Sequence, residues 1–130
     1  MDDDKRREDG MSQRRKVLGN EWVDKSLANR NAFNTDFQDL ITRYAWGDIW
    51  TRPHFDHHTR RVLVIGTMVA LGQWDEFRLH VRAALAEGGF TPEDIKEILL
   101  QQAIYCGVPA ANHAVKEAAA IVAELGLLKK

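Results

Sequence analysis

Glu76 and His80 are the residues of this 130-residue chain whose types and spacing best suit proton chemistry. They lie within residues 72–88, where apolar side chains recur at helical spacing: Trp74, Phe77, Val81, Ala84 and Leu85. In a helix, residues four apart meet on one flank, and a carboxylate beside an imidazole can hold a proton near neutral pH. The same spacing also occurs in ordinary surface pairs, which contribute about 0.3 kcal/mol to helix stability. Spacing alone favours this second interpretation.

Three arginines flank the polar loop that precedes the longest apolar run: Arg52, Arg60 and Arg61. At a helix N-terminus, where backbone amides already favour anions, a pair of arginines can clamp a carboxylate. Solvated charge is the alternative, and it is favoured because exposed arginines are the norm. The arginines are therefore candidate anion ligands and not assigned ones.

Tryptophan is concentrated near these groups, with Trp46 and Trp50 one helical turn apart and Trp74 beside Glu76. Aromatic rings at helical spacing usually belong to a core, because they carry much of its buried area. The alternative is a pocket wall that excludes water and holds a flat ring. Spacing favours the core.

Metal and thiol chemistry find little support. His54, His57 and His58 match the spacing of no metal-binding motif, and no cysteine lies near them in the sequence. Cys106 is the only cysteine, which excludes an intrachain disulfide and a CxxC motif. We expect no metal site, and we expect Cys106 to be a small buried residue.

Composition limits the protein class. The chain has 18 basic and 19 acidic side chains, a net charge of -1, which argues against a nucleic-acid or anionic-membrane partner. The N-terminus lacks the basic-then-apolar order of a signal peptide, and the run from Val62 to Leu71 is too short to span a bilayer. We expect a cytoplasmic protein with one domain over residues 1–130.

Apolar periodicity predicts an all-α fold, a single-domain bundle of about six helices. Residues 1–18, interrupted by Gly10, form either a helix or a frayed arm. The other expected helices cover residues 20–29, 36–50, 59–71, 72–88, 91–106 and 110–125. The run over 59–71 is apolar on nearly all sides and the last helix is rich in alanine, so we expect both to be buried between subunits.

Several segments in chain order resemble the carboxymuconolactone decarboxylase family, within the alkyl-hydroperoxidase D-like superfamily. They are RRKVLG at residues 14–19, YAWGDIWTRP at 44–53, Thr59-Arg60, Glu76 with His80, and IYCGVPAAN at 104–112. The resemblance implies an alkyl-hydroperoxidase D-like helical fold and a homo-oligomer, often a hexamer. Redox members of the superfamily carry a CxxC pair before a histidine. Aligning that histidine with His80 puts Gln73 and Glu76 at the cysteine positions, so the thiol chemistry is absent.

The implied reaction belongs to protocatechuate catabolism. 4-Carboxymuconolactone, a dicarboxylate lactone, loses CO2 to give β-ketoadipate enol-lactone, without metal or organic cofactor. The resemblance implies His80 as the proton donor and Glu76 as the carboxylate that orients it. It also implies a set of substrate-binding residues: Arg60, Arg52, Arg61, Trp46, Trp50 and Tyr44.

Charge refines these implied roles. Strong positive charge on the departing carboxylate would stabilise the ground state and oppose its loss. We therefore expect the arginines to bind the carboxylate of the acetate arm. We expect Trp46 or Trp50 to form the pocket wall beside the departing carboxylate. Two other functions stay open, an alkyl-hydroperoxidase-like redox protein and a non-catalytic oligomeric binding protein on the same fold.

Overall fold

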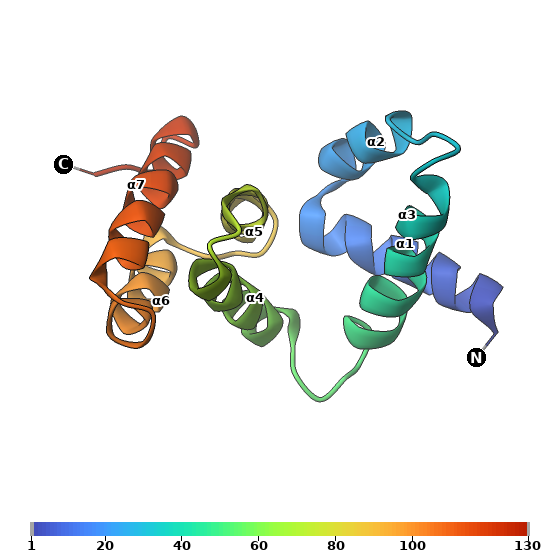
Figure 1. Cartoon of the computed structure of the whole chain (residues 1–130), viewed down its shortest axis with the longest axis horizontal. Coiled ribbons are helices and arrows are strands. Elements are labelled where there is room, and N and C mark those ends of the chain that lie inside the picture. Colours follow the sequence, from blue (N-terminus) through green and yellow to red (C-terminus); the bar gives the residue numbers. More distant parts are fainter. Residues whose placement is uncertain (1, 130) are drawn as a thin grey trace. The chain divides into compact units, whose positions relative to one another are not determined.

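The computed structural model describes residues 2–129, which contain helices and no strands (Figure 1). The all-α prediction is confirmed, with seven α-helices and one π-helix over these residues. The chain divides into two compact units, Met1–His57 and His58–Lys130, and each is described by itself. No helix within residues 2–129 is long and apolar enough to cross a membrane.

The first unit begins with a capped helix. The Asp2 carboxylate accepts a hydrogen bond from the Lys5 backbone N–H at 2.8 Å, so residues 3–18 are helical. Val17 and Leu18 are buried, so they anchor the end of this helix in the first unit. The elements of the first unit are α1 (Asp3–Leu18), α2 (Asn20–Ala28), α3 (Thr35–Ile41) and the π-helix η1 (Thr42–Ile49).

Gly10 lies inside α1, so the expectation that it interrupts the helix is wrong. A Cβ on Gly10 would overlap the Thr42 carbonyl oxygen and come within 2.8 Å of the Gly47 nitrogen. A Cβ on Gly47 would in turn overlap the Arg6 carbonyl oxygen. One glycine on each helix therefore lets the α1 and η1 backbones touch where they cross (Figure 1).

Arg14 joins three helices of the first unit. Its guanidinium donates hydrogen bonds to Ser26 Oγ at 3.0 Å and Gln38 Oε1 at 3.2 Å, and it lies 5.5 Å from the Trp22 ring. Only 4% of Arg14 is exposed, and burial lowers its pKa from the usual arginine range. Arg14 thus cross-links α1, α2 and α3 through neutral acceptors.

The helix expected over residues 36–50 is divided in two. α3 ends at Ile41, and the backbone widens into η1, which extends to Ile49. A π-helix adds a residue to each turn and occurs frequently at functional sites. Here it carries Tyr44 and Trp46, and Trp50 follows directly.

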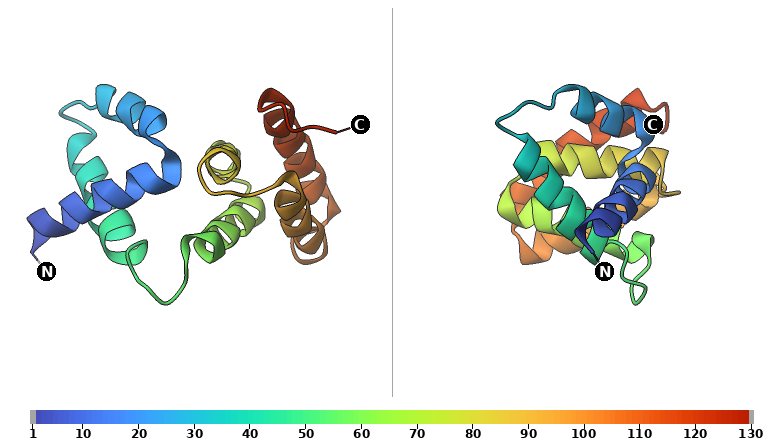
Figure 2. Two further views of the ribbon diagram at one scale, coloured as in Figure 1. Left: turned by 180° about the vertical axis from the view of Figure 1, so that it is seen from behind. Right: turned by 90° about the vertical axis from the view of Figure 1, so that its right-hand side faces the viewer.

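The second unit contains four helices, α4 beginning at its boundary: α4 (His57–Leu71), α5 (Trp74–Ala86), α6 (Pro92–Tyr105) and α7 (Val108–Glu124). α4 begins two residues earlier than expected. At the start of α6, Thr91 and Asp94 form the reciprocal capping box, and Pro92 is the first residue of the helix. Figure 2 shows the ribbons of these helices from two further sides. Their core includes Ile65, Phe77, Val81 and Ile121.

α4 is buried along one face only. That face carries Arg61, Ile65, Gly66 and Val69, whereas Leu63 and Leu71 are 54% and 63% exposed. Within the single chain, the other helices therefore cover only one side of α4. The expectation that subunits cover it stays a prediction.

Candidate active site

His80 lies on the inner face of α5 with 7% of its surface exposed. Phe77, one turn earlier, and Val81 and Ala84 are fully buried on the same helix. Burial, and then the positive charge of Arg61, lower the pKa of His80 from 6.5 to about 4. The imidazole is therefore neutral at pH 7 in the ligand-free protein.

Arg61 is the buried cation beside it. It lies on α4 with 2% of its surface exposed, and its pKa is lowered by burial, an effect that the Glu87 carboxylate partly opposes. A Cβ built on Gly88 would come within 2.5 Å of Arg61 Nε and 2.8 Å of Cζ. The guanidinium is thus packed directly against the backbone of the loop between α5 and α6.

That loop, residues 87–91, is held at both sides. The Gly88 N–H lies 3.1 Å from the carbonyl oxygens of Ala83 and Ala84, and the Phe90 N–H donates to Ala84 at 3.0 Å. Phe90 is buried, and the His58 ring stacks on it at 4.3 Å between centroids. The end of α5 and the start of α4 therefore fix the surface on which Arg61 rests.

The other predicted residues of the second unit lie at different depths. Arg60 is half-buried, whereas the adjacent Arg61 is buried. Glu76 is exposed one turn before His80, and the pKa of His80 reflects burial and Arg61, not Glu76. The role of Glu76 in orienting His80 stays a prediction.

The aromatic residues of the predicted site lie in the first unit. The Trp46 and Trp50 rings are 5.0 Å apart and tilted by 32°, and His57 meets Trp50 edge-on at 5.8 Å. Trp46 is buried, as the core interpretation expected. That Trp46 and Trp50 contribute to a site with His80 stays a prediction.

Tyr44 and Arg52 also belong to the first unit. The Tyr44 ring lies 5.2 Å from the Arg6 guanidinium, and its hydroxyl is 3.4 Å from Asp3 Oδ1, so it contacts α1. Arg52 is exposed just after η1. Their substrate-binding roles stay predictions as well.

α5 is tied to α7 by a set of contacts that spacing did not predict. The Trp74 and His113 rings stack at 4.2 Å, and His113 lies 3.3 Å from the Glu117 carboxylate. Arg78 donates to Glu117 at 2.8 Å and also pairs with Asp75. Trp74 thus packs against a neighbouring helix at the start of the helix that carries His80.

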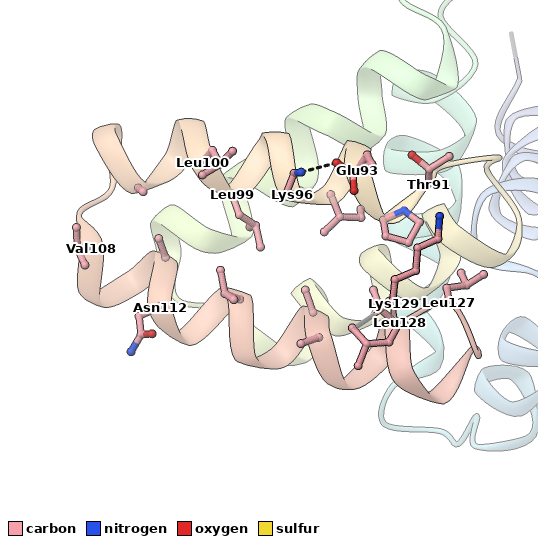
Figure 3. Close-up of a pocket in the computed structure, with 18 residues that line it drawn as sticks. Thr91, Glu93, Lys96, Leu99, Leu100, Val108, Asn112, Leu127, Leu128 and Lys129 are labelled. Atoms are coloured by element: carbon pink, nitrogen blue, oxygen red, sulfur yellow. Dashed lines mark ion pairs between the residues drawn. The ribbon is translucent and has the colours of Figure 1, made fainter.

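A separate apolar groove of about 840 Å³ lies between α6 and α7 (Figure 3). Leu99, Leu100, Val108, Val115 and Leu128 are among its lining residues. The predicted site residues are not among the described residues that line it. The groove is therefore distinct from the surroundings of His80.

The carboxymuconolactone decarboxylase family model matches residues 35–120. The chain belongs to this family. It is 42% identical over 127 residues to a 4-carboxymuconolactone decarboxylase of Acinetobacter baylyi, covering 98% of this chain and 94% of the relative. A nitrosuccinic acid decarboxylase of Metarhizium robertsii is 38% identical over 82% of this chain and 74% of its own length. A 48-residue 4-carboxymuconolactone decarboxylase sequence of Pseudomonas putida is 50% identical over its full length and 37% of this chain.

Proposed function

We propose that this protein is a carboxy-lyase that converts 4-carboxymuconolactone to β-ketoadipate enol-lactone and CO2. The observation that carries the proposal is a buried, neutral imidazole next to a buried cation, His80 and Arg61, on a family scaffold. The similarity to the Acinetobacter decarboxylase over 98% of the chain supports this substrate.

The chemistry of the substrate explains why a few side chains are enough to catalyse its decarboxylation. Its departing carboxylate is on a saturated ring carbon next to a C=C double bond, and that double bond is conjugated with the lactone carbonyl. When the bond to CO2 breaks, the electron pair enters an extended dienolate, so the substrate supplies its own electron sink. One proton must then reach the carbon next to the carbonyl. The protein has to bind a dianion, stabilise the dienolate and deliver that proton.

Arg60 and Arg61 divide the positive charge of the site. Arg60 is half-buried, and we assign it to the carboxylate of the acetate arm. Arg61 is enclosed in the protein and acts through its field on His80. A charge held away from the departing carboxylate avoids stabilising the ground state.

The low pKa of His80 sets a condition on proton donation. With a pKa of about 4, roughly one imidazole in a thousand is protonated at pH 7. A dianionic substrate that enters near Arg61 offsets its charge and raises the pKa of His80. In this proposal His80 takes up a proton from solvent as the substrate binds and transfers it to the dienolate, with Glu76 as the predicted orienting carboxylate.

Turnover of enzymatically generated 4-carboxymuconolactone tests the proposal, with CO2 and enol-lactone both measured. His80→Asn should lower kcat by about 10²–10⁴-fold, the usual contribution of a general acid. Glu76→Gln should lower it less, and His54→Gln, at an exposed loop position, is the matched control. Absence of CO2 release, or wild-type turnover in both His80→Asn and Glu76→Gln, would refute the assignment.

The same assay separates the other candidate functions. Nitrosuccinic acid should be included, since a nitro group also accepts the electron pair that a departing carboxylate leaves, and a relative is named for that activity. Turnover of peroxide would support a redox protein. Binding of the lactone without turnover would support a binding protein.

Exposed apolar surface supports a proposal about oligomerisation, and the cysteine content supports one about cellular location. We propose a homo-oligomer, with the hexamer implied by the resemblance as the expected size, because large apolar side chains are exposed on α6 and α7: Leu100, Ile104, Tyr105, Val108 and Val115. Light scattering measures the mass, and a stable monomer would contradict the proposal. We also propose a cytoplasmic location, which suits a chain with one cysteine and which cell fractionation tests.

A further inference from the structure

We infer that Gly88 is a positioning residue, whose missing side chain lets the α5–α6 loop hold the Arg61 guanidinium in place beside His80. The inference rests on the proposed function, because it concerns the cation of that site. Its basis is the contact between loop and guanidinium, where a Cβ on Gly88 would lie 2.5 Å from Arg61 Nε. Real Cβ atoms do not approach a neighbour so closely, so alanine at this position must displace something.

Space, and not backbone conformation, demands glycine at position 88. Gly89 has a φ of +72°, which favours glycine, but Gly88 is not among the glycines with positive φ. At Gly89 a Cβ would meet nothing within 4 Å. The two adjacent glycines therefore separate two effects, a blocked contact at Gly88 and backbone strain at Gly89.

The side chain of Arg61 is the part that must yield to a Cβ at position 88. The loop is tied by the Gly88 and Phe90 N–H groups to the end of α5, and Phe90 is buried under His58. The Ala84 carbonyl oxygen, 3.0 Å from the built Cβ, is helix backbone and equally fixed. Because a close-packed interior has no spare volume, the displaced guanidinium must move towards solvent.

Displacement of Arg61 has an electrostatic consequence for His80. The positive charge of Arg61, from α4, acts on His80, and the Glu87 carboxylate, from the loop, acts on Arg61. A guanidinium that has moved towards solvent is better screened and repels the imidazolium less. Gly88→Ala should therefore raise the pKa of His80 by about 1 unit, at the low end of the effect of a nearby charge.

Titration of the His80 ring by NMR in the full-length chain tests this without substrate, the resonance being assigned by its absence in His80→Asn. Gly88→Ala and Arg61→Gln should each raise the pKa of His80, and Gly88→Ala should add nothing in the Arg61→Gln background. Gly89→Ala, the matched control, should cost about 1 kcal/mol of stability by backbone strain and leave the pKa in place. An unchanged pKa in Gly88→Ala, or an equal rise with and without Arg61, would overturn the inference.

A second comparison covers the case in which Gly88→Ala does not fold. The alanine side chain ends at Cβ and has no atoms at the positions of Nε and Cζ of Arg61, so Gly88→Ala with Arg61→Ala should fold as well as Arg61→Ala alone. Failure of that double variant to fold would place the clash elsewhere and refute the inference. A normal titration result with no decarboxylation would refute the proposed function alone. Decarboxylation with an unchanged His80 titration in Gly88→Ala would refute the inference alone.

Discussion

Lowering the pH should destabilise the folded protein through His80. The pKa of His80 is about 4 in the folded chain and 6.5 as the ordinary value, so the unfolded chain binds more protons between these limits. The contribution of His80 to stability is therefore complete above pH 6.5 and is lost as the pH falls towards 4. Between pH 7.5 and pH 5 the loss from this one group is about 2 kcal/mol.

Urea unfolding at pH 7.5 and pH 5 measures this loss, at one fixed protein concentration because subunit association would add to stability. His80→Gln cannot acquire the charge, so its free energy of unfolding should fall by about 2 kcal/mol less than that of the wild type. His54→Gln, at an exposed position, should keep the wild-type loss. If His80→Gln and the wild type lost the same stability on acidification, His80 would not be buried as a neutral group, and the proton uptake proposed for substrate binding would lose its basis.

Three further variants test the packing and capping that position the site, all by urea unfolding at pH 7.5. Gly10→Ala should destabilise the protein despite the usual gain of about 1 kcal/mol for alanine in a helix, because a Cβ there overlaps the Thr42 carbonyl oxygen; a net gain would disprove the close crossing. Thr91→Ala removes the side-chain half of the capping box and should cost about 1 kcal/mol, whereas no cost would mean that the cap is made by water in solution. Phe77→Ala empties the fully buried space beside His80 and should cost about 3–5 kcal/mol, and a cost under 1 kcal/mol would contradict its burial.

Local chemistry made much of the second unit predictable. α6 begins at Thr91-Pro92, and Gly126 follows the end of α7. Helix starts and ends of this kind depend on backbone groups within a few residues, so the adjacent sequence is enough to predict them. The sequence motifs also indicated the family, and the family is confirmed. Such signals need no knowledge of what packs against the helix.

Contacts between distant segments were not predictable in the same way. Gly10 looked like a helix interruption because its partners, Thr42 and Gly47, are remote in sequence. The π-helix, too, looked like a continuation of α3, because apolar spacing alone does not register one added residue per turn. Sequence periodicity describes the apolar face of a single helix. The close contact at Gly10 depends on a second helix that is remote in the sequence.

The candidate site shows the same division. The sequence by itself determined that a histidine, a nearby carboxylate and a group of arginines belong to one helical protein of this family. Only the tertiary structure decided that Arg61 and not Arg60 is buried, because adjacent residues on a helix point about 100° apart and only packing against α5 and its loop selects between them. It also decided that His80 is neutral, since a pKa depends on burial and on charges brought together from α4 and α5. The side-chain types were written in the sequence, and the fold set their electrostatic environment.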